Sequence, residues 1–224
     1  MKLKFISLFA VLLVGAFALS SCNIGIAQKD YSKTVTDISL FEFVSDASGE
    51  TYGLKVREGA DLPETVRLPE TYEGKPVVSV LSEGFMNFSS LKEITLPASF
   101  TSIGSAAFNG CTSLSTVRSE KVSLVSANAF FGCVSLRYFD FDSVKEIGDY
   151  AFSETAVYEL EFKAVEKIGV RAFYKCDKLH NVYIPETTVY IGEDAFSKTG
   201  NVLFDVSSSN PVYQKDANGK IVEK

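Results

Sequence analysis

The stretch Ile103-Gly104-Ser105-Ala106-Ala107-Phe108-Asn109-Gly110-Cys111-Thr112-Ser113-Leu114 recurs along the chain with small variations. Each copy holds a phenylalanine that follows a small residue and lies five residues after an apolar one. These phenylalanines return every 21 to 23 residues, at Phe85, Phe108, Phe130, Phe152, Phe173 and Phe196. Six copies at a nearly constant period predict a solenoid, in which each rung buries its apolar side chains against its neighbours.

A short strand is expected after each phenylalanine, because apolar residues occupy the first, fourth and sixth positions of the segment that follows it. In the fifth copy these residues are Leu179, Val182 and Ile184. The last two alternate with polar residues, as in a strand with one buried face. The segment around each phenylalanine is too short for a full helix, so a single helical or 3₁₀ turn is expected there.

The stacked model makes the inner phenylalanines the most important for stability. Replacing Phe130 or Phe152 by alanine is expected to cost about 3–5 kcal/mol, and more than the same change at Phe85 or Phe196.

Both ends of the repeat region have the sequence pattern of a β-hairpin. Residues 40–44 and 52–56 are apolar runs joined by a turn that contains Gly49, and an Asn218-Gly219 turn lies between apolar residues near the C-terminus. A stack of parallel strands has an open edge at each end, and such edges invite aggregation. The hairpins are therefore interpreted as caps, in residues 36–64 and 207–224, around repeats in 65–206.

The first 21 residues are typical of a secretory signal peptide. Lys2 and Lys4 precede an apolar run that ends in Leu19-Ser20-Ser21-Cys22. The small residues before the cysteine resemble a bacterial lipobox, which implies cleavage before Cys22 and lipidation of its thiol. An ordinary signal peptide with a chance cysteine is the alternative. Residues 22–35 would then be a short tether, with the lipid as the only attachment to the membrane.

The charge of the chain argues against two classes of partner. The formal net charge is −6, and the leader contributes only basic residues, so the remainder is more acidic still. An acidic protein is a poor match for nucleic acid or for an anionic membrane surface.

Three cysteines remain once Cys22 is assigned to lipid. Cys111, Cys133 and Cys176 each lie three residues after a repeat phenylalanine. The equivalent position elsewhere holds Phe or Thr, so it is interpreted as a packing site with buried thiols. A bridge between Cys111 and Cys133 on neighbouring rungs is the alternative. No CxxC spacing and no second histidine accompany these residues, so no metal site and no cofactor is expected.

The repeat resembles the BspA-type leucine-rich repeat. The resemblance rests on Ile-Gly pairs such as Ile103-Gly104 and Ile147-Gly148, on the Ala-Phe pairs that follow them, and on a cysteine that precedes the first strand leucine. It covers about residues 60–206. It implies a β-rich, right-handed leucine-rich-repeat-type stack of about six rungs with short 3₁₀ or helical turns. It also implies a bacterial surface protein. Some members of the family are adhesins for host matrix proteins such as fibronectin and fibrinogen.

Outward strand positions in the middle rungs collect tyrosines and acids. Such side chains on a rigid sheet could recognise a basic patch on a protein, or a sugar. An ordinary solvated face is the alternative, because tyrosine also suits strands. The candidate ligand-binding residues are Tyr138, Asp140, Tyr158, Glu159, Glu161, His180 and Tyr183.

No residue pattern in the chain predicts catalysis. His180 is the only histidine, no nucleophile motif or phosphate-binding loop occurs, and Glu159 and Glu161 share one strand face rather than two walls of a cleft. The leading hypothesis is therefore a non-enzymatic, lipid-anchored envelope protein, on either face of the outer membrane, that binds a host or neighbouring-cell protein. A glycan-capture lipoprotein and a structural or assembly protein of the envelope are the alternatives.

Overall fold

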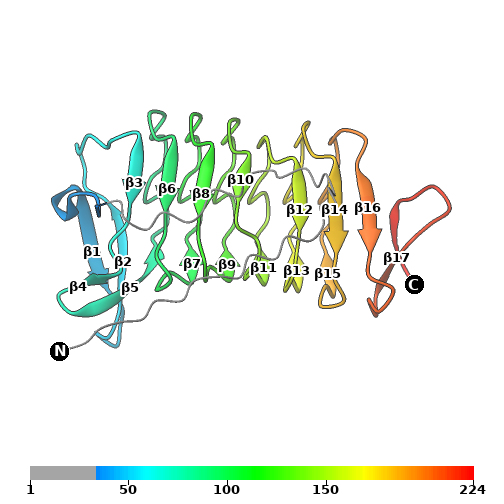
Figure 1. Cartoon of the computed structure of the whole chain (residues 1–224), viewed down its shortest axis with the longest axis horizontal. Coiled ribbons are helices and arrows are strands. Elements are labelled where there is room, and N and C mark those ends of the chain that lie inside the picture. The colour runs from blue at the N-terminus through cyan, green and yellow to red at the C-terminus, as the bar shows by residue number, and fades with distance from the viewer. Residues whose placement is uncertain (1–33) are drawn as a thin grey trace, which may run out of the picture. The chain divides into compact units, whose positions relative to one another are not determined.

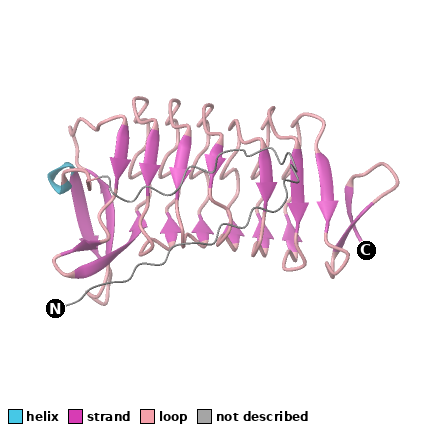
Figure 2. Ribbon diagram, viewed as in Figure 1, coloured by secondary structure: helices cyan, strands magenta, loops and turns pink. Residues whose placement is uncertain are grey.

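The computed structural model describes residues 34–224, which form one compact unit, Thr34–Lys224. The predicted signal peptide, Cys22 and most of the tether lie outside the described residues. Residues 34–224 form a β-solenoid of about seven turns, so the predicted stack of rungs is confirmed (Figure 1). The one helical element in this part of the chain is the 3₁₀ turn η1, Ile38–Leu40 (Figure 2).

A nine-stranded sheet runs the length of the stack. Each rung contributes the short strand that precedes its phenylalanine, and these strands pair in parallel. The order is β1 (Phe41–Ser45), β2 (Tyr52–Val56), β5 (Lys75–Val80), β7 (Ser102–Ile103), β9 (Leu124–Val125), β11 (Glu146–Ile147), β13 (Lys167–Ile168) and β15 (Tyr190–Ile191), with β4 (Thr71–Tyr72) added to β5.

The strands that follow the phenylalanines form two further parallel sheets, in the upper row of Figure 1. A four-stranded sheet contains β3 (Thr65–Arg67), β6 (Glu93–Thr95), β8 (Thr116–Arg118) and β10 (Tyr138–Phe139). A three-stranded sheet contains β12 (Glu159–Glu161), β14 (Asn181–Ile184) and β16 (Leu203–Val206). The row is divided because β10 and β12 do not pair, although they belong to consecutive rungs.

The division coincides with two bulky side chains. Phe139 and Phe141 occupy core positions where the preceding rung has Val117 and Ser119, and their ring centroids lie 4.8 Å apart. Both rings contact Phe152 of the next rung, at 5.1 Å. The rung that follows is also one residue shorter. The core continues across the break, but the backbone ladder above it does not.

The segments around the phenylalanines are tight turns rather than the helical or 3₁₀ turns that we expected. The residues two before and two after each phenylalanine have left-handed backbone angles, for example Ala106 at φ 54° and Gly110 at φ 72°. A right-handed helical turn cannot contain such residues. The left-handed positions let alternate N–H groups of each turn point along the stack.

Those N–H groups form a third set of hydrogen bonds between rungs, which we call the turn ladder. In each rung the phenylalanine and the residues two before and two after it donate to carbonyl oxygens of the next rung. Thus Ala106, Phe108 and Gly110 donate to Ala127, Ala129 and Phe131, at 3.0, 2.7 and 2.9 Å. The same three bonds join each of the five successive pairs of rungs, and they offset the strain of the left-handed residues.

The repeat phenylalanines stack in one column through the core. Consecutive rings have centroids 5.0 to 5.5 Å apart and planes within 22° of parallel. Phe85, Phe108, Phe130, Phe152 and Phe173 are fully buried, whereas Phe196 is partly buried. Phe85 is therefore buried as fully as the inner phenylalanines, so the structure no longer supports a smaller loss of stability at Phe85 than at Phe130 or Phe152.

The cysteines form a second buried column, and the prediction of buried thiols is confirmed. Cys111, Cys133 and Cys176 are fully buried and free, so the alternative of a bridge between Cys111 and Cys133 is wrong. Each Sγ donates to the carbonyl oxygen of a phenylalanine in the preceding rung, at 2.9 to 3.1 Å. The thiol thus fills space and also pairs a backbone oxygen that the turn leaves in the core.

The Ile-Gly pairs are explained by the close approach of neighbouring rungs. A Cβ atom on Gly148 would lie 2.5 Å from the backbone nitrogen of Ala127, and one on Gly192 would lie 2.4 Å from that of Val170. Real Cβ atoms do not come so close to backbone, so glycine at these positions sets the spacing between rungs.

The two hairpins differ in how they join the stack. β1 and β2 pair antiparallel and extend the nine-stranded sheet. β17 (Tyr213–Lys215) and β18 (Ile221–Glu223) pair antiparallel with each other in a separate two-stranded sheet. The expected hairpin caps are both present, but only the N-terminal one continues a sheet.

Candidate binding face

The outward side chains of the three-stranded sheet form a regular grid. Strand register places Glu159, Asn181 and Leu203 side by side in one row. It places Glu161, Tyr183 and Asp205 side by side in the next row. We call these six residues the binding face. A hollow of about 450 Å³ lies over them, lined by all six.

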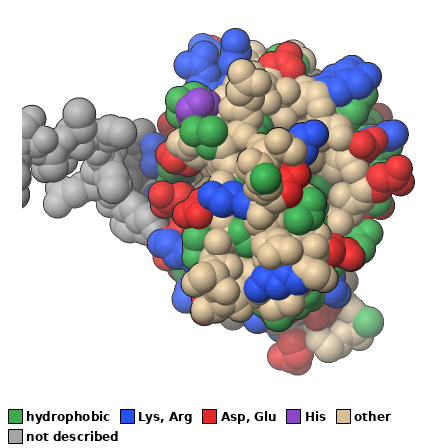
Figure 3. All heavy atoms as spheres, turned by 90° about the vertical axis from the view of Figure 1, so that its right-hand side faces the viewer, with side chains coloured by type: hydrophobic (Ala, Val, Ile, Leu, Met, Phe, Trp, Pro, Cys, Tyr) green, Lys and Arg blue, Asp and Glu red, His purple; other side chains and the backbone are tan. Residues whose placement is uncertain are grey.

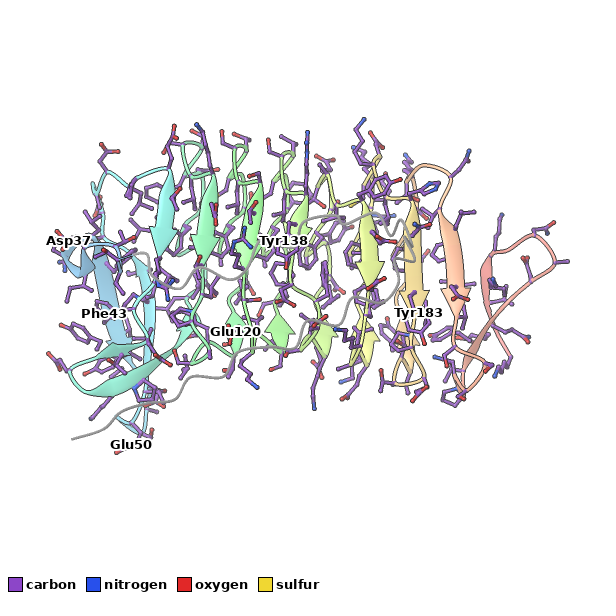
Figure 4. All side chains as sticks on the ribbon, in the orientation of Figure 1. Asp37, Phe43, Glu50, Glu120, Tyr138 and Tyr183 are labelled. Atoms are coloured by element: carbon purple, nitrogen blue, oxygen red, sulfur yellow. The ribbon has the colours of Figure 1, made fainter. Side chains whose placement is uncertain are left out.

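Apolar groups on this face remain exposed to solvent. Leu203 has a relative exposure of 61% and Tyr183 one of 36%. In Figure 4, Tyr183 lies on β14 and Tyr138 on β10, both on the divided row of strands. Exposed aromatic and aliphatic side chains beside polar groups are the usual anchors of protein interfaces.

The carboxylates of the binding face have few basic partners. Asn181 donates from Nδ2 to Oε1 of Glu159 at 3.1 Å, and Lys215 Nζ lies 4.0 Å from Asp205. Lys163, at the edge of the hollow, pairs with Asp142 at 2.6 Å. No lysine or arginine occupies an outward strand position of this sheet.

The four-stranded sheet has mixed charge rather than a net negative charge. Its outward strand positions hold Arg67, Arg118 and a single acid, Glu93, which pairs with Arg118 at 3.0 Å. The division between β10 and β12 therefore also separates a surface of mixed charge from an acidic one.

The structure brings together some of the residues that the sequence singled out. Glu159, Glu161 and Tyr183 lie in the binding face. Tyr158 and His180 lie beside it on adjacent rungs, with rings stacked 5.7 Å apart, and Tyr158 has 56% exposure.

Tyr138 and Asp140 lie on the other side of the division. Tyr138 is 48% exposed, and Arg118 lies over its ring with the guanidinium carbon 5.7 Å from the centroid. Asp140 accepts a hydrogen bond from the backbone of Asp142 at 3.2 Å. These two residues belong to a surface with a different electrostatic character.

Three residues of the binding face, Asn181, Leu203 and Asp205, were not among the candidates that the sequence suggested. The hollow adds them because it extends to the last strand, β16. Leu203 could have been found from the sequence, since it is an apolar residue at an outward strand position, where the other rungs have polar or aromatic ones.

The buried thiols are unsuited to nucleophilic chemistry. Burial raises the pKa of the Cys111 thiol to about 12 and that of the Cys176 thiol to about 11, and it also raises the pKa of Cys133. The reactive form of cysteine is the thiolate, which these environments disfavour. Within residues 34–224, no cluster of three or more His, Cys, Asp and Glu side chains is placed to hold a metal ion.

Residues 34–224 also contain no helix with the length and hydrophobicity that a membrane span requires.

Comparison with known proteins identifies the repeat. Six copies of the BspA type leucine rich repeat region match residues 78–203. A search of curated proteins finds no significant match.

Solved structures with the same fold come from several bacteria. A leucine-rich repeat protein of T. pallidum is 24% identical, with a TM-score of 0.62 over 79% of this chain and 90% of that one. A leucine rich cell surface protein of Faecalibacterium prausnitzii is 22% identical, with a TM-score of 0.54 over 85% of this chain and 61% of that one. The pneumococcal vaccine antigen PcpA is 18% identical, with a TM-score of 0.52 over 82% and 52%. At these identities the likeness concerns the fold, and the chain spans only about half to three fifths of the latter two.

Proposed function

Because this chain belongs to the BspA-type leucine-rich repeat family, we propose that it is a lipid-anchored, non-catalytic surface protein that binds a protein ligand. The family and fold support a role in protein interaction or at the cell surface. The segment Leu19-Ser20-Ser21-Cys22 supports a lipid anchor at Cys22. The neighbour from Faecalibacterium prausnitzii is itself described as a cell surface protein, which supports exposure outside the cell.

The observation that carries the proposal is the binding face. It combines an exposed leucine and tyrosine with three carboxylates, on strands whose backbone is fixed by the parallel pairing of β12, β14 and β16. A rigid surface loses little conformational entropy on binding. Glu159, Glu161 and Asp205 are complementary to a basic patch on a protein, which would gain both steering and specificity from them.

The first experiment measures binding of the purified chain to immobilised matrix proteins, with fibronectin and fibrinogen as the probes. The double variant Tyr183→Ala and Leu203→Ala should lose at least about tenfold in affinity, since it removes both exposed apolar anchors of the binding face. Tyr190→Ala is the matched control, because Tyr190 has 48% exposure but lies on β15 of the nine-stranded sheet. Unchanged affinity of the double variant would refute the assignment of the binding face.

A second experiment tests the anchor and the location. Protease treatment of intact cells should remove the protein, and Cys22→Ala should release it from the membrane fraction. Survival of the protein until the outer membrane is broken would refute surface exposure and favour a structural or assembly role inside the envelope.

A glycan ligand is the second candidate. The stacked rings of Tyr158 and His180 offer an exposed aromatic surface of the kind on which sugar rings pack. Retention of the chain in polysaccharide-containing gels, lost in Tyr158→Ala and kept in Tyr190→Ala, would favour this candidate over a protein ligand.

A further inference from the structure

The turn ladder ends at the last rung with three backbone donors that have no acceptor in the part of the chain that the structure describes. In every earlier rung the phenylalanine and the residues two before and two after it donate to the next rung. In the last rung these residues are Asp194, Phe196 and Lys198. Their N–H groups have no hydrogen-bond acceptor within residues 34–224. The C-terminal end of the stack thus presents a donor row.

The donor row follows from the direction of the ladder. All of its N–H groups point towards the C-terminal end and all of its accepting carbonyls point towards the N-terminal end. The peptide dipoles of six rungs are therefore aligned, and aligned hydrogen bonds polarise one another. The N–H groups of the last rung therefore remain available to an added acceptor.

The C-terminal hairpin covers other parts of this end. Tyr213 is buried, and its Oη accepts a hydrogen bond from the backbone of Ile191 in β15 at 2.8 Å. β16 pairs with β14 alone, and β17 lies close to it without strand pairing. Phe196 is partly buried, with a stacked ring, Phe173, on its inner side at 5.5 Å. The hairpin therefore contacts the last strand of the nine-stranded sheet through Tyr213 and supplies no acceptor to the turn ladder.

The spacing of the donors favours a polypeptide acceptor over a free anion. A sulfate or phosphate would engage adjacent N–H groups, whereas these three belong to alternate residues. The five joints between rungs already show what binds such a row: alternate carbonyls of a turn that places a small residue before a phenylalanine. Figure 3 shows acidic and basic side chains mixed over this end, and Asp194 itself carries a carboxylate, so the surface does not concentrate anions.

The N-terminal end of a second copy of this chain is a poor match for the donor row. Three equivalent carbonyls lie at its N-terminal end, those of Ser82, Gly84 and Met86, and the central one, of Gly84, already accepts from Val56 of the hairpin β1–β2 at 2.9 Å. Phe85 behind it is fully buried, and Phe41 of the hairpin lies 6.1 Å from it. The N-terminal hairpin therefore blocks head-to-tail growth.

We propose that the C-terminal end is a docking site for a polypeptide segment of a partner protein, folded in the same small-residue–Phe turn. The segment adds its carbonyls to the N–H groups of Asp194, Phe196 and Lys198 and places its phenylalanine at the end of the ring column. This site is separate from the binding face, and its occupation does not depend on the ligand proposed there.

The test uses a peptide with the sequence of residues 190–199, Tyr-Ile-Gly-Glu-Asp-Ala-Phe-Ser-Lys-Thr, added to the full isotope-labelled chain. Amide NMR should show shifts at Asp194, Phe196 and Lys198, and hydrogen exchange there should slow at least about tenfold at saturation. The internal control is the equivalent set Arg171, Phe173 and Lys175, whose donors are already paired. A peptide of the same composition in scrambled order should have no effect.

Three results would overturn the proposal. One is the absence of amide shifts at the donor row with peptide up to about 2 mM, the range of weak binding. Another is equal binding of the scrambled peptide. The third is a response of the three amides to sodium sulfate but not to the peptide, which would make the row an anion site. A binding-face variant that loses its protein ligand but still binds the peptide would show that this proposal and the proposed function stand or fall separately.

Discussion

The two ends of the solenoid are closed to different degrees. At the N-terminal end, hairpin β1–β2 continues the nine-stranded sheet, buries Phe41 and Leu54 completely and pairs with the carbonyl of Gly84. At the C-terminal end, hairpin β17–β18 pairs only with itself, and Phe196 stays partly exposed. The stack is thus covered at the end where the carbonyls of the turn ladder face outward. It is left open at the end where the N–H groups of the turn ladder face outward. Capping a stack requires matching its hydrogen-bond direction as well as covering its core.

The largest expected effect concerns the phenylalanine column. Phe130→Ala and Phe85→Ala should each lower the free energy of unfolding by about 3–5 kcal/mol, because both rings are fully buried with rings on either side. Phe196→Ala should cost about 1–2 kcal/mol, since its ring is only partly removed from water. Urea denaturation of the three variants measures the difference. Equal losses at Phe85 and Phe196 would contradict the contrast between the ends.

The next effect concerns backbone protection in the unliganded chain. The amides of Asp194, Phe196 and Lys198 should exchange at least about 100-fold faster than those of Arg171, Phe173 and Lys175 one rung earlier. The two sets occupy the same repeat positions. They differ chiefly because only the earlier set has a following rung to accept its hydrogen bonds. Site-resolved exchange monitored by NMR provides the measurement. Similar protection of both sets would mean that the last rung has acceptors after all.

The smallest expected effect is a difference between the two hairpin turns in how their stability responds to pH. Asp46 accepts hydrogen bonds from Ser48 and Thr51, which lower its pKa from 3.8 to about 2. Asp216 accepts from the backbone of Lys220 and Asn218, which also lowers its pKa. A lowered pKa in the folded state means that each carboxylate stabilises its turn above the unfolded value, and that this contribution is lost as the pH falls through the folded value.

The C-terminal turn should therefore loosen first as the pH falls from about 4 towards 2, because the pKa of Asp46 is lowered further. Carboxyl NMR titration gives both midpoints directly. Asp46→Asn should remove the response of the N-terminal turn while leaving that of Asp216 unchanged. A midpoint for Asp46 near its ordinary value would contradict the hydrogen-bonded turn.

The repeating columns were predictable from the sequence because they follow from spacing alone. Phenylalanines every 21 to 23 residues must stack if the rungs are in register, and cysteines at a fixed offset from them must share a second column. The outward rows of the strands were predictable for the same reason, which is why Glu159, Glu161 and Tyr183 were found.

The conformation of the turns was not predictable from residue type. Left-handed backbone is usually signalled by Gly or Asn, yet Glu83, Ala106, Tyr150 and Arg171 adopt it here. The hydrogen bonds between rungs impose it, and these exist only once the rungs have stacked. The division between β10 and β12 depends similarly on how Phe139 and Phe141 pack in three dimensions, so the separation of Tyr138 from the binding face emerged only in the structure.

The buried thiols can report where along the solenoid the rungs open. A maleimide reagent cannot reach Cys111, Cys133 or Cys176 while the rungs are closed, because each is fully buried and protonated. Cys111 and Cys133 lie on consecutive rungs in the N-terminal half of the repeats, and Cys176 lies one rung before the open end. The relative labelling rates of the three would therefore map fraying along the axis, residue by residue, without any engineered probe.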